Sequence, residues 1–232
     1  MKDFEKMTKT QFAVFCLLAV FSGIMIGIGG IASLVAISTM GEWGRLVGAC
    51  LFSLAIFAIM AFEMKLFTGM VASIPAMSVK HLWQLVVCFL CNALGVLLVG
   101  AISEYTPFGG VAAENGAALI AGKLDLEKWP LVAVCSSMLC GVLITTSVRS
   151  PYHVVEKGLS ATLGVVFPII VFAFCGFDHS VANMLYFYYL GEFSWKIVAY
   201  VLLTIVGNVI GGVALPLVMM LREKARRQGG RS

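Results

Sequence analysis

The chain has 232 residues, of which 60% are hydrophobic and 12% charged, with a formal net charge of +4. An ordinary soluble domain contains about 45–50% apolar and about 25% charged residues, so a soluble fold of this size could not bury so much apolar surface. The composition therefore excludes a freely soluble enzyme, a nucleic-acid-binding module and a secreted disulfide scaffold. It predicts an all-α integral membrane protein.

Six membrane crossings are predicted, because a transmembrane helix needs about 20 mostly apolar residues. Four stretches without Asp, Glu, Lys or Arg are long enough to cross unaided, namely 10–41, 82–103, 129–148 and 197–221. Two further apolar regions are interrupted, 46–79 by Glu63 and Lys65 and 158–191 by Asp178 and His179. The longest connection, 104–128, leaves no room for a soluble domain. We therefore expect one transmembrane domain over residues 1–232.

Lys and Arg side chains are distributed unevenly across these crossings. One side of the membrane receives 11 of them, from the N-terminus, the second and fourth connections and the basic tail 222–232, and the other side receives 4. The remaining one, Lys65, lies inside a crossing. Because cytoplasmic loops carry the excess of Lys and Arg, both termini are predicted to lie in the cytoplasm, with the chain in the plasma (inner) membrane. The first apolar run is too long for the apolar region of a signal peptide.

All seven cysteines lie in apolar runs, where free thiols behave as small buried hydrophobes. Cys88 and Cys91 form a C-x-x-C pair, but the sequence has no second ligand pair to complete a tetrahedral metal site. We expect these cysteines to pack between helices. No metal and no cofactor is predicted.

Three features of the first half of the chain recur in the second half. Asn92-x-x-Gly95 returns as Asn208-x-x-Gly211 after 116 residues, and Gly23 returns as Gly141 after 118. The two interruptions, centred near residues 68 and 179, are 111 residues apart. Three crossings have been duplicated, as about 10–103 and about 129–221. Because three is odd, the second copy enters the membrane from the opposite side, which makes an inverted repeat.

The two interruptions are predicted to break the second and fifth helices near the membrane midplane, where irregular backbone must line a cavity or be packed in protein. The apolar stretches that follow, 70–77 and 181–190, are long enough only for half-helices. Asp178 or Ser180 suits the N-cap of the second half-helix. Both half-helices would direct the positive ends of their dipoles at the midplane, which favours an anion or a polar neutral molecule over a cation.

His179 is the strongest candidate for a functional residue, because it is the one histidine at membrane depth. Its imidazole can donate a hydrogen bond when neutral and can exchange a proton near pH of about 6 to 7. His81 and His153 lie in polar connections. Thr68, at the matching place in the first break, supplies a hydroxyl donor.

The charges inside the breaks have two interpretations. Charged groups at membrane depth normally pair, so Lys65 is expected to pair with Glu63 or with Asp178. The alternative is that these residues act directly in attracting anions.

The breaks resemble motifs of the formate/nitrite transporter family. The stretch from Pro168 to Met184, with its His-Ser-x-Ala-Asn-Met part, is similar to that family's fifth-helix motif. Leu66-Phe67-Thr68-Gly69 is similar to its second-helix motif, and the stretch from Gly207 to Gly212 is similar to its sixth-helix motif. The resemblance implies an aquaporin-like fold in a homopentamer with one pore per subunit. It also implies passage of small monovalent anions or their conjugate acids, such as formate, nitrite or hydrosulfide.

The resemblance also implies roles for individual residues. His179, Thr68 and Asn208 would form the central polar site, and Lys123 would attract anions at the external vestibule. Apolar constrictions would close the pore on both sides, the cytoplasmic one made by Leu66 and Phe67 and the outer one by Phe52 and Phe172.

Two positions depart from the family pattern. Lys65 stands where the family commonly has an acid, and Gly141 stands after Cys140 where an asparagine is common.

Two alternative functions are disfavoured by the sequence. A water or polyol channel of the same fold is disfavoured because neither break carries Asn-Pro-Ala and no arginine lies within a span. A haem-bearing subunit or an intramembrane enzyme is disfavoured because one intramembrane histidine cannot supply paired axial ligands, and because the sequence lacks the H-E-x-x-H and G-x-S-x-G motifs. We therefore expect a transporter and not an enzyme.

Overall fold

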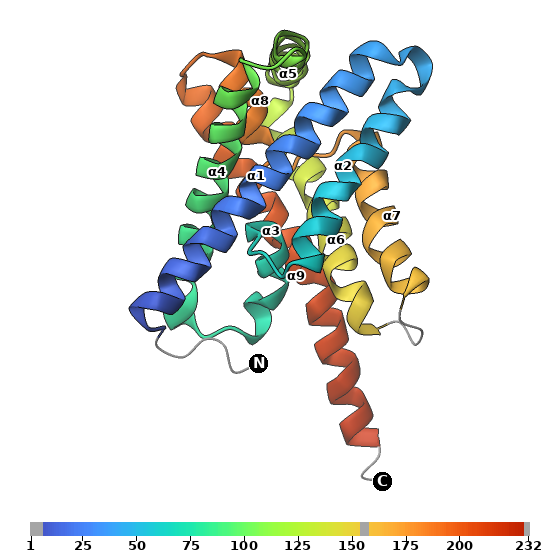
Figure 1. Ribbon diagram of the computed structural model, residues 1–232. Coiled ribbons are helices and arrows are strands. Elements are labelled where there is room, and N and C mark those ends of the chain that lie inside the picture. Colours follow the sequence, from blue (N-terminus) through green and yellow to red (C-terminus); the bar gives the residue numbers. More distant parts are fainter. Residues whose placement is uncertain (1–6, 154–157, 230–232) are drawn as a thin grey trace.

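The computed structural model describes residues 7–153 and 158–229, and helices are the only regular elements within these ranges (Figure 1). The long helices are α1 (Lys9–Thr39), α2 (Gly44–Ala61), α4 (Trp83–Ser103), α6 (Trp129–His153), α7 (Leu159–Cys175) and α9 (Trp195–Gly229). The shorter α-helices are α3 (Phe67–Met70), α5 (Gly109–Leu124) and α8 (Asn183–Leu190). Three 3₁₀ segments complete the fold, η1 (Gly41–Trp43), η2 (Val71–Ala76) and η3 (Val79–His81).

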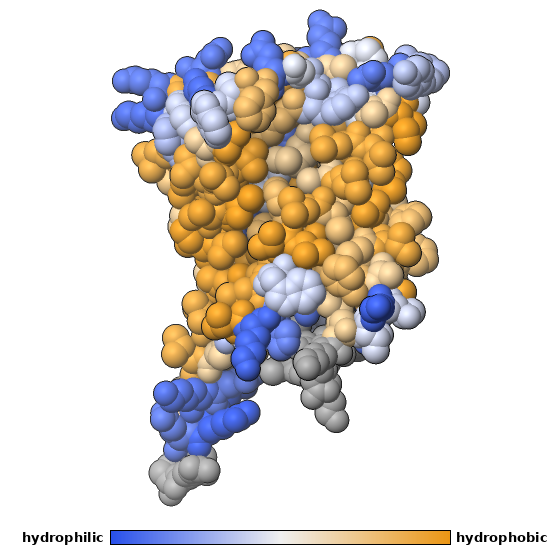
Figure 2. Space-filling model, turned by 90° about the vertical axis from the view of Figure 1, so that its left-hand side faces the viewer, coloured by the Kyte–Doolittle hydropathy of each residue, from blue (hydrophilic) through white to orange (hydrophobic). Residues whose placement is uncertain are grey.

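Six crossings with two broken members are confirmed. Helical segments long and apolar enough to span a membrane are Lys9–Thr39, Gly41–Ala61, Val79–Ser103, Trp129–His153 and Trp195–Gln228. The second crossing breaks after α2 and continues through α3 and η2, and the fifth is divided into α7 and α8. An apolar band surrounds the middle of the molecule between two polar ends (Figure 2). This band is the surface expected to face the lipid.

The start of α1 and the end of α9 lie at the same end of the molecule (Figure 1). The last turns of α9 project beyond the bundle, so residues 222–229 of the basic tail are helical. Part of the charge count falls outside the described residues, namely Lys2, Lys6, Lys157 and Arg231. The described cations at this end still outnumber those at the other, because four of them belong to the final turns of α9 (Arg222, Lys224, Arg226 and Arg227).

The inverted repeat is visible in the packing. In the first repeat α1 contacts α2 and α4, and in the second α6 contacts α7 and α9. The second half of each broken crossing contacts the other repeat as well, since η2 packs against α9 and α8 against α4. Contacts between α2 and α7 also join the two repeats. The two irregular segments are therefore enclosed where the repeats meet.

Gly23 and Gly141 allow the central helices to approach closely. A Cβ atom at Gly23 would collide with the backbone carbonyl of Asn92 on α4, and a Cβ atom at Gly141 would collide with that of Asn208 on α9. Small residues at such crossings let membrane helices pack backbone to backbone. This contact explains the glycine in the fourth crossing, because a side chain there would push α6 away from α9.

Helix α5 was not predicted, since residues 104–128 were interpreted only as a connection. Its buried residues recur every three or four positions, at Gly109, Ala112, Gly116, Ile120 and Leu124, which is the spacing of one helix face. The helix lies at the end of the molecule opposite the termini and packs against α8 and α1 (Figure 1). Its last turn carries Lys123.

Candidate functional site

In each broken crossing, the first half-helix is terminated by a residue whose backbone conformation is not helical. After α2, Glu63 adopts a positive φ of 51° and Leu66 is extended before α3 begins. After α7, Gly176 adopts a left-handed φ of 71°, a conformation that glycine tolerates at a helix C-terminus. The second half-helices begin at Phe67 and Asn183, a few residues from the positions predicted.

The first break is held by the side chain of Asn92 on α4. Its Nδ2 donates to the carbonyl of Ala19 at 2.7 Å and to the carbonyl of Lys65 at 2.8 Å. Its Oδ1 accepts from the backbone N–H of Phe67 at 2.8 Å. The Sγ of Cys88, one member of the C-x-x-C pair, also approaches the Lys65 carbonyl, at 3.4 Å. Asn92 thereby satisfies backbone groups that the interruption frees from helical hydrogen bonds.

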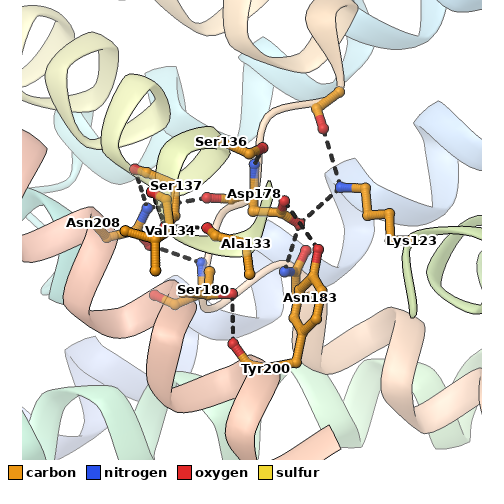
Figure 3. A network of polar contacts seen from close by, with 12 residues as sticks. Lys123, Ala133, Val134, Ser136, Ser137, Asp178, Ser180, Asn183, Tyr200 and Asn208 are labelled. Carbon is orange, nitrogen blue, oxygen red and sulfur yellow. Dashed lines mark hydrogen bonds and ion pairs between the residues drawn. The ribbon is translucent and has the colours of Figure 1, made fainter. Parts of the chain in front are cut away.

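Asn208 on α9 holds the second break in the same way. Its Nδ2 donates to the carbonyl of Ser137 at 2.8 Å and to the carbonyl of Asp178 at 3.0 Å. Its Oδ1 accepts from the backbone N–H of Ser180 at 2.9 Å (Figure 3). The amide is therefore committed to the backbone on both sides of the break. Asn208 therefore positions the backbone of the second break. It is not among the described residues that line the cavity beside His179.

These two sets of bonds fix the register of the repeat. Lys65 and Asp178 offer the equivalent carbonyls, and Phe67 and Ser180 offer the equivalent N–H groups, at a common separation of 113 residues. Thr68 and His179, 111 residues apart, are therefore not equivalent positions, so the predicted correspondence is wrong by two residues. The centres of the two interruptions are 111 residues apart, whereas the equivalent hydrogen bonds are 113 residues apart. No function was predicted for Asn92, although the N-x-x-G motif that it shares with Asn208 indicates an equivalent role.

Thr68 and His179 meet across the interface between the repeats. The Thr68 Oγ1 lies 2.8 Å from the His179 Nε2, and the two residues are 2% and 1% exposed. The other ring nitrogen, Nδ1, accepts from the backbone N–H of Ala182 at 3.1 Å. This acceptor role assigns a neutral tautomer with the hydrogen on Nε2, which then donates to Thr68. The Thr68 hydroxyl keeps its own hydrogen for another acceptor.

The predicted N-cap is wrong. Helix α8 starts at Asn183, and its N-cap position is taken by Ala182, whose side chain cannot accept a hydrogen bond. The Asp178 carboxylate is engaged elsewhere, and the Ser180 Oγ is buried without a hydrogen-bond partner among the described residues. The ring of His179 accepts the freed N–H of Ala182 instead.

Asp178 is fully buried and bound by three side chains (Figure 3). Its Oδ1 accepts from the Nζ of Lys123 at 2.8 Å and from the Nδ2 of Asn183 at 3.0 Å. Its Oδ2 accepts from the hydroxyl of Tyr200 at 3.1 Å. The backbone N–H of Asp178 donates to the Oγ of Ser136 at 2.9 Å. A buried carboxylate needs such partners to offset its desolvation.

The predicted pairing of Lys65 with Asp178 is therefore wrong, because Lys123 from α5 takes that place. Pairing of Lys65 with Glu63 is also wrong: neither residue forms a salt bridge with any part of the chain that the structure describes. Glu63 is exposed and Lys65 is half-buried, so neither charge is enclosed by the protein as that of Asp178 is. The Lys123–Asp178 pair could not be predicted, because the helix that carries Lys123 was not predicted.

Apolar side chains lie on both sides of the Thr68–His179 pair. Phe52 and Phe172 contact edge to face with ring centroids 5.5 Å apart, and Phe172 also stacks on the His179 ring at 5.9 Å. In the first break Leu66 and Phe67 are each 4% exposed and directly precede Thr68. The polar pair is thus framed by side chains that disfavour a hydrated ion.

A cavity of about 50 Å³ has His179, the Phe52–Phe172 pair, Lys123 and Asn183 among its lining residues. A single water needs roughly 10–15 Å³ measured in this way, so the cavity has room for a small ion or a few waters. Lys123 reaches it with a side chain that is 19% exposed, and its Nζ also donates to the carbonyl of Gly176 at 3.0 Å. Sequence reasoning missed Asn183, Tyr186 and Tyr200 in and around this cavity.

Comparison with known proteins gives one consistent result. Residues 1–222 match the family described as formate/nitrite transporter. The chain is 27% identical over 231 residues to an uncharacterized transporter, YrhG, of Bacillus subtilis (strain 168), covering 89% of this chain and 84% of that one.

Two solved structures share the fold. A pentameric formate channel with formate bound is 20% identical, with a TM-score of 0.77 over 94% of this chain and 99% of that one. An FNT family ion channel is also 20% identical, with a TM-score of 0.78 over 92% and 91%.

Proposed function

Since this chain belongs to the formate/nitrite transporter family, we propose that it passes small monovalent weak-acid anions, such as formate, nitrite or hydrosulfide, through a pore in each subunit of a homopentamer. The plasma membrane is the proposed location, with both termini in the cytoplasm. One observation carries the proposal: two hydrogen-bonding side chains, Thr68 and His179, meet in a buried position between apolar residues. The similarity to a pentameric formate channel supports the oligomeric state and the class of substrate.

The apolar side chains determine what the polar pair must do. An anion that passes Phe52 and Phe172 loses water, at a free-energy cost of several kcal/mol or more for a bare charge. The Thr68 hydroxyl can replace part of that hydration by donating to the anion, and the Nε2–H of His179 orients that hydroxyl. A proton passed to the anion through the imidazole would lower the barrier further, because a neutral acid crosses apolar surfaces at little electrostatic cost.

Lys123 attracts the anion before it reaches the centre. Because its charge is balanced by Asp178, we propose that it acts through a directed N–H donor more than through long-range attraction. The inward-facing ends of the half-helices add a positive potential at the midplane.

The test uses purified protein in proteoliposomes. Swelling and flux are measured with formate, nitrite, hydrosulfide, lactate and glycerol at several pH values, for the wild type and for His179→Asn. We expect anion flux that depends on pH in the wild type and loses that dependence in His179→Asn, since an amide keeps hydrogen bonding but carries no proton near neutrality.

His153→Asn is the matched control, because His153 is exposed at the end of α6. An unchanged pH profile in an assembled His179→Asn protein would make the histidine structural. Permeation of glycerol but of none of the anions would instead identify a neutral-solute channel of the same fold.

A further inference from the structure

The tyrosines near the second break differ in how their hydroxyls are used. The hydroxyl of Tyr188 donates to Glu104 at 2.6 Å, that of Tyr189 lies 2.7 Å from the Ser103 Oγ, and that of Tyr200 donates to Asp178 at 3.1 Å. The hydroxyl of Tyr186 has no hydrogen-bond partner among the residues that the structure describes. Tyr186 is half-buried, and its hydroxyl is not among the fully buried polar atoms that lack a partner. The hydroxyl is therefore accessible to a partner that the protein itself does not supply.

Tyr186 lines the cavity beside His179. Its ring packs against both apolar clusters of the bundle. The same cavity is lined by Lys123 and by the central His179. The hydroxyl-bearing side chain thus shares one small space with both residues.

Lys123, which lines the same cavity, also has an unused donor. An ammonium group has three N–H donors, and the structure uses two of them, on the Asp178 carboxylate and the Gly176 carbonyl. Lys123 and Asn183 line the cavity, whereas Asp178 is not among the described lining residues. The carboxylate has its oxygens turned to Lys123, Asn183 and Tyr200 (Figure 3). The described lining of the cavity therefore includes the donors Lys123 and Asn183 but not the buried carboxylate, which lies behind them.

We infer that Tyr186 is a binding and specificity-determining residue of the pore, whose hydroxyl donates to a small anion held beside Lys123 on its way to His179. This inference rests on the proposed function and adds to it a residue that neither the repeat nor the family motifs indicate. Two side chains with free donors that line one small cavity suit an anion with acceptor atoms, because each donor can replace a hydrogen bond lost with water. Tyr186→Phe removes one donor and leaves every described hydrogen bond of the protein intact.

The experiment compares Tyr186→Phe with Tyr189→Phe in proteoliposomes. Tyr189→Phe is the matched control, because it removes a hydroxyl on the same helix that already has a protein partner. Formate flux is measured against formate concentration. We expect the half-saturating concentration to rise about tenfold in Tyr186→Phe, the scale of a lost hydrogen bond to a charged group, with little change in maximal rate. The control keeps the wild-type value.

A second measurement does not depend on transport. Formate raises the thermal midpoint of the wild type in detergent if it binds the folded state, and we expect a smaller rise in Tyr186→Phe at the same formate concentration. Wild-type half-saturation and wild-type stabilisation in Tyr186→Phe would overturn the assignment, as would equal changes in both variants. A wild type that passes none of formate, nitrite and hydrosulfide would overturn the proposed function itself, and the assignment with it.

Discussion

In both broken crossings an asparagine on the adjacent long helix holds the irregular backbone, Asn92 for the first break and Asn208 for the second. The side chains of the breaks differ. Asp178 in the second break is buried and bound by Lys123, Asn183 and Tyr200, whereas Lys65, at the equivalent place in the first, is half-buried and has no salt bridge within the described chain. The duplication has thus preserved the backbone scaffold while the side-chain chemistry of the two halves has diverged.

The largest expected effect comes from removing either asparagine. Asn92→Leu and Asn208→Leu would each leave buried N–H and C=O groups unpaired, at about 1–3 kcal/mol for each group. We expect both variants to lose several kcal/mol and to yield little folded protein, to a similar extent. Yield of assembled protein and thermal midpoint in detergent measure this.

Asn115→Leu is the control for these variants, because Asn115 bonds only to Val111 within its own helix. A severe loss for Asn208→Leu beside a mild one for Asn92→Leu would contradict the equivalence of the two breaks.

The next effect concerns the ion pair that only the second break has. Asp178→Asn strands the ammonium of Lys123 in a largely buried place, and removing one member of a buried pair costs roughly 3–5 kcal/mol. We expect Asp178→Asn and Lys123→Met each to lower the thermal midpoint strongly. The double variant should recover much of the loss, since both charges are then gone.

In the first break, removing the charge of Lys65 should leave the stability of the protein almost unchanged. Lys65→Met is expected to change stability by no more than about 0.5 kcal/mol, as for an exposed side chain, because no carboxylate depends on it. Strict additivity of Asp178→Asn and Lys123→Met, or a large loss for Lys65→Met, would show that the charges are partnered differently from the described contacts.

The membrane crossings, their two breaks and the inverted repeat could be predicted from the sequence. Apolar length determines the crossings, since the bilayer forces every backbone group within it to be bonded inside the protein. The breaks and the inversion follow from that length and from the repeated N-x-x-G. His179 was predicted from its position within a membrane crossing, and in the structure it forms a hydrogen bond with Thr68.

Contacts between distant segments were beyond the sequence. Lys123 and Asp178 are 55 residues apart and meet only because α5 folds over α8. A single sequence records neither the direction of a helix outside the membrane core nor the side chains it brings together. The missed donors Asn183 and Tyr200 bind the same carboxylate as Lys123, so the unpredicted helix α5 accounts for the wrong partner that was assigned to Asp178.

The smallest effect, and the finest test of the asymmetry, concerns anion entry past Lys65. Because its charge is not balanced by a salt bridge within the described chain, Lys65 should act over about one Debye length, ~10 Å at 0.1 M salt. We expect Lys65→Glu to slow anion flux a few-fold from the side of the membrane that carries the termini, at low ionic strength. The effect should fade at 1 M salt, where the screening length falls to ~3 Å. The control is Lys80→Glu, which changes the same charge on a residue outside the break. Equal slowing by both variants would mean that Lys65 contributes only to the general surface potential, and the first break would then lack a charged anion-attracting residue of its own.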